Sequence, residues 1–265
     1  MLVAIGSAKG SPGATSTALA VAAVWPRPVV LVEADPSGGD LALRCTVQGG
    51  GPLVVTPNLL GLAAAVREDR SPGALHAYAQ TLGCGVSVIP GVSASGQAAG
   101  LSNLWSPIAR ACRDATVDVI ADLGRVDAGS RSLPIAAAAH QLVLVGSPSL
   151  EGFLHLRETA RELAAASHRG PAGHRLVKPV LTVSDRHANQ DCADLNQVLE
   201  VAGVNAAPAR HLSYDVDALR RLERGEQASG RLGRTLLIRS ARALVDQLIP
   251  AVAASDSIGE EVTTR

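Results

Sequence analysis

The chain has 265 residues, of which 47% are hydrophobic, so it is long and apolar enough to bury a core and is not expected to be disordered. Its 24 basic residues balance its 24 acidic residues, so contact with a polyanion would depend on a local basic patch rather than on net charge. Two tryptophans, two tyrosines and one phenylalanine are too few for the aromatic stacking surfaces that bind single-stranded nucleic acids.

The amino-terminal segment has some features of a secretory signal, because Lys9 precedes an apolar run at 18–25. The order is wrong for a signal, however, because another apolar run comes before Lys9 and no small-residue cleavage pattern precedes Glu33 and Asp35. No run reaches the roughly 18 to 20 apolar residues that cross a bilayer. We therefore expect a soluble, cytoplasmic protein.

Short runs rich in β-branched residues alternate with segments of helical periodicity along almost the whole chain. This alternation predicts an α/β fold with one doubly wound, mostly parallel sheet flanked by helices, spanning 1–252 and followed by a flexible polar tail at 253–265. The predicted strands are 2–6, 29–33, 85–89, 117–122, 141–146, 176–183 and, more weakly marked, 207–212. The predicted helices are 15–24, 59–68, 73–82, 96–113, 129–139, 150–166, 189–201, 215–223 and 234–248.

The cysteines and histidines are dispersed. No C-x-x-C pair and no H-x-x-x-H or H-E-x-x-H pattern occurs, so neither a zinc site nor a disulfide framework is predicted. We expect the four cysteines to be reduced thiols in the core: Cys45, Cys84, Cys112 and Cys192.

A glycine-rich turn, S-A-K-G-S-P-G-A-T-S at 7–16, joins the first predicted strand to the first predicted helix. Free backbone N–H groups and the helix dipole converge at such a turn and favour an anion such as phosphate, although an ordinary βα turn has the same glycines. Lys9 is one of only two lysines in the chain. Thr15 stands at the helix start, where its hydroxyl caps the helix, binds a magnesium ion, or does both.

This turn resembles the deviant phosphate loop of the ParA/MinD family of P-loop ATPases, K-G-G-x-G-K-[ST]-[ST]. Two later segments are also similar to motifs of that family: V-E-A-D-P-S-G at 32–38, and D-V-I-A-D-L-G at 118–124. The resemblance implies that Asp35 orients an attacking water and that Asp122 contacts Mg²⁺ through water. A strand-end or turn-capping role is the alternative for both carboxylates.

The resemblance implies ATP and Mg²⁺ as cofactors and assigns residues to three roles. The implied nucleotide-binding residues are Lys9, Gly10, Ser11, Gly13, Ala14, Thr15 and Ser16. The implied metal site comprises Thr15, Asp35 and Asp122, and the implied catalytic residues are Asp35 and Lys9, the latter reaching across a dimer to the partner's nucleotide.

Several residues depart from the family pattern. Ala14 replaces the second lysine of the loop, and loss of its charge-assisted hydrogen bond is expected to weaken triphosphate binding by roughly one to two decades and to impair hydrolysis more. Glu33 stands where the family has aspartate, and the segment 183–187 offers no adenine-reading asparagine. Whether the chain is an active ATPase is left open by its sequence.

Arginines are concentrated at 205–242, a segment that contains eight arginines and four acidic residues. The candidates for DNA binding without sequence preference are Arg220, Arg221, Arg224, Arg231 and Arg234; a solvated helical face is the alternative. An apolar stripe on the last helix is expected to pack onto the domain rather than to bind a membrane.

The sequence thus predicts a homodimeric, nucleotide-linked switch that positions or recruits a cellular assembly, either pilus or secretion machinery or DNA. It resembles the CpaE/TadZ-type pilus-localisation branch at least as much as the chromosome-partitioning branch. The alternatives are a nucleotide-independent pseudo-ATPase scaffold, and a partitioning protein that binds DNA without sequence preference through the arginine-rich region.

Overall fold

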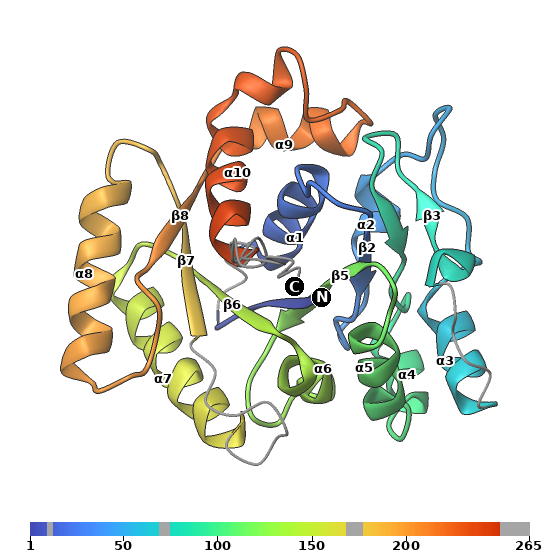
Figure 1. Ribbon diagram of the computed structural model, residues 1–265, viewed down its shortest axis with the longest axis horizontal. Helices are drawn as coiled ribbons and strands as arrows, with labels where there is room; N and C mark the ends of the chain where they lie inside the picture. Colours follow the sequence, from blue (N-terminus) through green and yellow to red (C-terminus); the bar gives the residue numbers. More distant parts are fainter. Residues whose placement is uncertain (10–12, 69–74, 168–176, 250–265) are drawn as a thin grey trace, which may run out of the picture.

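The computed structural model describes residues 1–9, 13–68, 75–167 and 177–249. The strands of these residues form one sheet in the order β3-β4-β2-β5-β1-β6-β7-β8, with helices on both faces (Figure 1). Every neighbouring pair is parallel except β3 and β4 at one edge, which confirms the predicted fold class. The strands are β1 (Leu2–Ser7), β2 (Val29–Glu33), β3 (Gln80–Thr81), β4 (Ser87–Ile89), β5 (Asp118–Arg125), β6 (Gln141–Gly146), β7 (Val177–Val183) and β8 (Arg210–Ser213).

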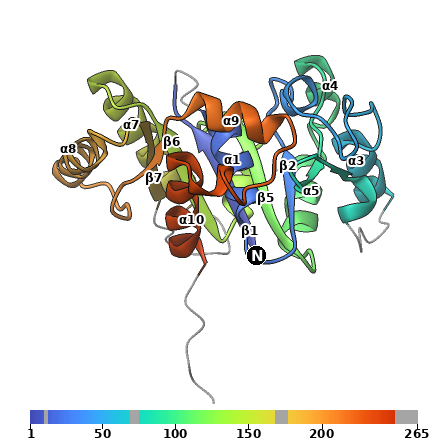
Figure 2. The same cartoon turned by 90° about the horizontal axis from the view of Figure 1, so that it is seen from above.

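The helices divide into two layers. One face of the sheet is covered by α3 (Leu59–Arg67), α4 (Ser95–Gly100), α5 (Trp105–Arg113), α6 (Leu133–Ala138), α7 (Leu150–Ser167) and α8 (Ala188–Val201). The other face is covered by α1 (Ala14–Ala23), α2 (Leu41–Arg44), α9 (Val216–Glu223) and α10 (Leu236–Leu248). Figure 2 shows α1, α9 and α10 side by side in this second layer.

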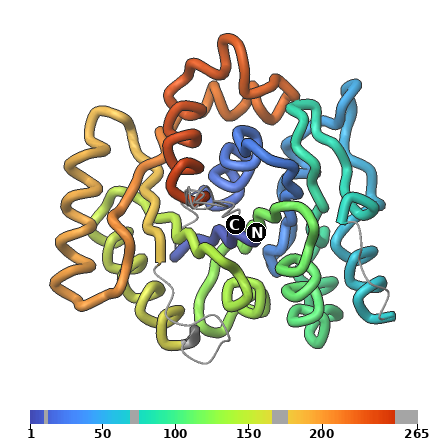
Figure 3. The backbone as a smooth tube through the Cα atoms, viewed as in Figure 1, coloured from blue at the N-terminus to red at the C-terminus, as the bar shows by residue number. Residues whose placement is uncertain are grey.

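Burial on both faces explains why the central strands read as continuous apolar runs. All six residues of β1 are buried, with Leu2 and Ala4 in one core and Val3 and Ile5 in the other. Figure 3 shows that α3 and α8 stand at opposite ends of the sheet, so β1 and β5 lie in its middle. The carboxyl ends of β1, β2 and β5 therefore meet at the centre of one sheet edge.

The prediction of a helix at 73–82 is wrong. Its described part forms a 3₁₀ turn (Leu75–Tyr78) and then β3, which pairs antiparallel with β4. The side chain of Gln80 bonds to the backbone of Val54 and Pro57, and these long-range bonds hold the segment extended. Local periodicity carries no information about such partners.

The predicted helix 96–113 is two helices, because the chain turns between α4 and α5. Leu101 and Trp105 are both buried against the same core, and hydrogen bonds from Leu101 and Leu104 to the residues three positions earlier close the turn. The predicted helix at 129–139 begins only at Leu133, because Asp127 caps a turn through Gly129 and Ser130. The short helix α2 was not predicted.

The cysteines of the structure are all free thiols. Cys45, Cys84 and Cys112 are buried, as expected, whereas Cys192 on α8 is partly exposed. Burial raises the pKa of Cys45 and of Cys112 to about 12. Among the described helices, none is long and apolar enough to cross a membrane. The predicted tail at 253–265 lies outside the described residues.

Candidate functional site

The first site feature is the start of α1, directly after β1. Gly13 precedes the helix with φ +96°, a left-handed conformation that favours glycine. The first backbone bond of the helix runs from the N–H of Thr17 to the carbonyl of Gly13, at 2.9 Å. The N–H groups of Ala14, Thr15 and Ser16 therefore have no acceptor within the helix, and no acidic side chain occupies the first turn. Gly10 and Ser11 lie outside the described residues.

Thr15 and Asp122 are brought together by the sheet. Asp122 lies on β5, and its carboxylate accepts a 3.0 Å hydrogen bond from the N–H of Gly124. The Thr15 hydroxyl lies close enough to this carboxylate to lower its pKa, against the larger effect of burial. Only 1% of Asp122 is exposed, and burial raises its pKa to about 7. The interpretation of Thr15 as the helix cap is wrong, because Gly13 occupies that position.

Asp35 follows β2 and approaches the same place. Its Oδ1 accepts a 2.7 Å hydrogen bond from the N–H of Ser37, so the residue does cap a turn. Its Oδ2 lies over Gly124, where a Cβ atom would be only 1.8 Å away. Burial raises the pKa of Asp35, and its charge contributes to the raised pKa of Asp122. The structure therefore gathers Thr15, Asp122 and Asp35 from three elements.

Glu33 has a structural position beside this group. Its two carboxylate oxygens accept hydrogen bonds from the N–H of Leu41 at 2.9 Å and from the N–H of Gly91 at 3.0 Å. Burial raises the pKa of Glu33. The side chain thus joins the start of α2 to the loop after β4.

A cavity of about 310 Å³ opens beside the start of α1. Gly13 and Ser16 form one wall, and side chains at the ends of β7 and β8 and on α9 and α10 form the rest, including Leu212, Leu219 and Leu237. A largely apolar cavity next to backbone N–H groups that have no acceptor within α1 has the chemistry for a flat ring joined to an anionic group. No sequence pattern indicated this cavity, because its walls come from five separate segments.

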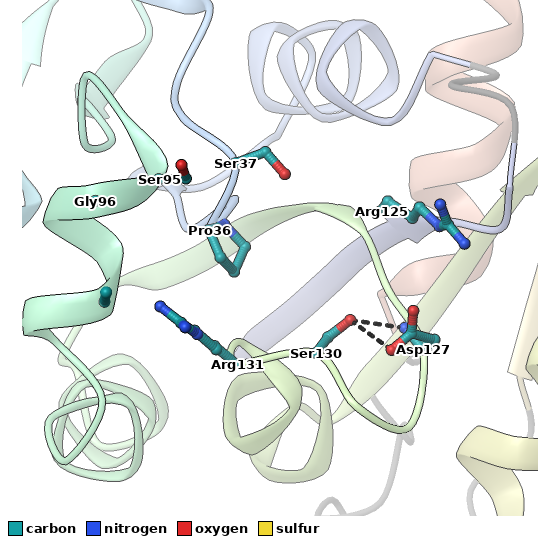
Figure 4. Close-up of a pocket in the computed structure, with 9 residues that line it drawn as sticks. Pro36, Ser37, Ser95, Gly96, Arg125, Asp127, Ser130 and Arg131 are labelled. Carbon is teal, nitrogen blue, oxygen red and sulfur yellow. Dashed lines mark hydrogen bonds between the residues drawn. The ribbon is translucent and has the colours of Figure 1, made fainter.

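Lys9 is exposed and does not line that cavity. It lines a different cleft, of about 440 Å³, together with Arg125, His155, Glu158 and Glu162. A third cleft, of about 710 Å³, adjoins it and includes Ser37, Arg125 and Arg131. In Figure 4 the side chain of Arg131 extends toward α4, while Arg125 stands on the opposite side of the cleft.

No group of three or more His, Cys, Asp and Glu side chains is arranged to hold a metal ion anywhere in the described part of the chain. A magnesium ion held at Thr15 and Asp122 would therefore need oxygen atoms from water or from a ligand. Such sites are usual for Mg²⁺, which keeps several waters and takes substrate phosphates as ligands.

The arginines predicted to bind DNA lie on and after α9. Arg221 is paired with Glu226 through a 2.7 Å bond, and Arg220 is 3.8 Å from Asp217. The others, Arg224, Arg231 and Arg234, are exposed.

One arginine next to the start of α1 was missed by sequence reasoning. Arg44, at the end of α2, donates from Nη2 to the Ser16 hydroxyl at 3.1 Å and from Nε to a carboxylate oxygen of Glu223 at 2.8 Å. No signal in the sequence pointed to it, because neither α2 nor its contact with α9 was predicted.

Comparison with known proteins identifies solved structures with a similar fold. No protein-family model and no curated protein sequence matches the chain. Among solved structures, a ParA family ATPase from Chlorobium tepidum TLS matches with a TM-score of 0.70 and 17% identity, over 94% of this chain and 98% of that one. The cell division ATPase MinD of Pyrococcus furiosus matches with a TM-score of 0.66 and 17% identity, over 93% and 97% of the two chains. A complex of Cyanothece McdA with ATP matches with a TM-score of 0.64 and 17% identity, over 93% and 95%.

The eight-stranded, mostly parallel sheet with helices on both faces is a doubly wound α/β fold. More narrowly, the chain has the fold of the ParA/MinD ATPases over nearly its whole length, as its sequence motifs predicted.

Proposed function

We propose that this protein is a ParA/MinD-like switch that binds ATP with Mg²⁺ at the start of α1, dimerises, and thereby positions or recruits a cellular assembly. The observation that carries this function is the contact between Thr15 and Asp122 beside an apolar cavity. An ordinary connection between a strand and a helix does not require a buried carboxylate beside the second residue of the helix. The McdA relative of known structure was solved with ATP.

In this function the residues have distinct roles. The N–H groups of Gly13, Ala14, Thr15 and Ser16, with those of Gly10 and Ser11, bind the phosphates. Thr15 and Asp122 hold Mg²⁺, which neutralises phosphate charge, and a cation lowers the pKa of a carboxyl group beside it. Asp35 holds a water near the same point. The 310 Å³ cavity takes the base.

Lys9 has a separate role in the dimer. It lines a cleft that includes neither Thr15 nor Asp122, which supports a contact with the nucleotide of a second copy rather than with its own. The assembly positioned by the dimer is pilus or secretion machinery, or DNA. We place the protein in the cytoplasm, where ATP is present and its free cysteines stay reduced.

Hydrolysis is expected to be weak or lost, because Ala14 carries no ammonium group to stabilise charge on the transferred phosphate. Calorimetric titration with Mg-ATP tests binding directly, and Ala14→Lys is the informative variant. One charge-assisted hydrogen bond is worth about 1.5 to 3 kcal/mol, so the variant should bind ATP roughly 10- to 100-fold more tightly. Ala23→Lys adds the same charge at the far end of α1 and should leave affinity unchanged.

An absence of heat at millimolar Mg-ATP with the wild-type protein would reject the nucleotide-linked switch and favour a nucleotide-independent scaffold. Equal affinities for the wild type and Ala14→Lys would show that the missing lysine is not the cause of weak binding.

A second function, DNA binding without sequence preference, is favoured by the exposed arginines Arg224, Arg231 and Arg234. Such binding depends on release of counterions, so a gel shift should weaken steeply between 50 and about 200 mM salt. A shift that does not respond to salt, or the absence of a shift, would exclude this function.

A further inference from the structure

Arg44 is held at the start of α1 by a well-packed segment. Leu41, at the first position of α2, is fully buried, and its N–H is bonded to Glu33. The partner of Arg44 is equally fixed, because the backbone carbonyl of Glu223 accepts a 3.1 Å bond from the N–H of Thr46. The guanidinium is therefore a positioned group, about one-third exposed, rather than a free surface charge.

The hydrogen bonds of Arg44 leave part of its donor set unused. Nε and Nη2 are bonded to Glu223, and Nη2 is also bonded to the Ser16 hydroxyl. For Nη1, no acceptor occurs among residues 1–9, 13–68, 75–167 and 177–249. A guanidinium carries five N–H donors in a planar fork that suits phosphate oxygens.

Ser16 connects this arginine to the ligand site. Its N–H is one of the three first-turn groups without an acceptor within the helix, and its side chain lines the 310 Å³ cavity. An anion that contacts Ser16 is therefore within reach of the group bonded to the Ser16 hydroxyl. We infer that Arg44 is a phosphate-binding residue of this site and supplies part of the positive charge that Ala14 lacks, an inference that rests on the proposed nucleotide function.

Glu223 provides a second test of this inference, because its carboxylate would compete with a phosphate for the Arg44 guanidinium. In the structure its carboxylate neutralises Arg44 and is itself largely buried, with 12% of its side chain exposed. Removing this carboxylate charge should free Arg44 for a phosphate and tighten binding, whereas removing the arginine should weaken it. A purely structural ion pair predicts that both changes do harm.

The test is calorimetric titration of the full chain with Mg-ADP and, separately, with adenosine. Arg44→Gln should weaken Mg-ADP binding about tenfold and leave adenosine binding unchanged, because adenosine has no phosphate. Glu223→Gln should tighten Mg-ADP binding about threefold, and the double variant should bind like Arg44→Gln. Arg27→Gln is the matched control, since Arg27 forms an ion pair with Asp118 at the opposite end of β5 and should not change binding.

The inference falls if Arg44→Gln binds Mg-ADP as the wild type does, if it loses affinity for adenosine equally, or if Glu223→Gln also weakens binding. The Glu223→Gln result stands even if Arg44→Gln fails to fold, because a gain of affinity requires a folded site. A wild-type protein that binds neither Mg-ADP nor Mg-ATP overturns the proposed function and this inference together. Binding by the wild type with no response to either variant overturns the inference alone.

Discussion

At the scale of single residues, Asp122 is the most informative side chain, because its buried carboxyl group couples proton binding to stability. Its pKa is about 7 in the folded chain, against an ordinary value of 3.8. Between these values the folded protein holds a proton that the unfolded protein has lost, so stability falls as pH rises through this window and levels off above it. The free energy of unfolding lost across this pH window is on the order of 4 kcal/mol, at about 1.36 kcal/mol per pKa unit.

Asp122→Asn removes the titrating group while its carbonyl oxygen still accepts the bond from Gly124. In metal-free and nucleotide-free protein, we expect the variant to gain stability relative to the wild type as pH increases from 4 to 8. Urea denaturation of both proteins across this range measures the difference, and carboxyl groups that do not interact with Asp122 cancel in the comparison. A difference that does not change with pH would show that Asp122 does not titrate there.

Gly124 is the residue that permits Asp35 to lie beside Asp122. It has φ +60°, and a Cβ would meet Oδ2, Cγ and Cβ of Asp35. Gly124→Ala should therefore displace Asp35 and destabilise the fold by about 2 kcal/mol or more, as judged by urea denaturation. The matched control is Gly96→Ala on α4, where the added Cβ has no atom within 4 Å and should stabilise the protein slightly. Equal effects of the two substitutions would contradict this account.

At the scale of elements, α3 and α1 differ in whether a side chain caps the first N–H groups of the helix. Asn58 caps α3 by accepting bonds from the N–H groups of Leu60 and Gly61, at 2.9 and 3.2 Å. The start of α1 has no side-chain cap, since Gly13 cannot provide one. A helix start without a cap beside a cavity has N–H groups available for a ligand, whereas a capped start serves stability.

Asn58→Ala should therefore destabilise the protein by about 1 kcal/mol, the usual contribution of an N-cap side chain. Asn189→Ala, an exposed position in the first turn of α8, should change the free energy of unfolding by less than about 0.5 kcal/mol. Thermal or urea unfolding of both variants is sufficient. If Asn58→Ala did not change the free energy of unfolding, the claim that this cap stabilises the protein would be contradicted.

At the scale of the whole molecule, Lys9 lines a different cleft from the cavity beside the start of α1. Lys9 lines its cleft with Glu158 and Glu162, and neither Thr15 nor Asp122 lines that cleft. We expect Mg-ATP to convert the protein to a dimer in light scattering after gel filtration, and Lys9→Ala to dimerise less.

Lys178 provides the control for that experiment, because it is the only other lysine and its Nζ is bonded to the carbonyl of Gln247 on α10. Lys178→Ala should dimerise like the wild type. If Lys9→Ala also dimerised fully, Lys9 would have no role between subunits.

The order of strands and helices was largely readable from the sequence, because a parallel sheet covered on both faces requires continuous apolar runs separated by helical periodicity. Strands β2 and β6 were predicted to the residue. The glycine-rich turn and the carboxylates at strand ends were readable for a related reason, since parallel strands place their carboxyl ends at one edge. The predictions failed at 73–82 and between α4 and α5, where Gln80 and Trp105 are positioned by partners distant in sequence.

By itself, then, the sequence determined the sheet and most of its helical layers, and it predicted an anion site at the glycine-rich turn before α1. Only the tertiary structure decided that Gly13 rather than Thr15 is the N-cap residue of α1, that Thr15 lies beside the buried Asp122, and that Arg44 is bonded to Ser16. The physical reason is the distance along the chain over which each kind of interaction acts. Periodicity and turn chemistry act over a few residues, whereas a pKa or an ion pair depends on which distant segments the sheet brings into contact, and these contacts span 107 residues for Thr15 and Asp122 and 179 for Arg44 and Glu223.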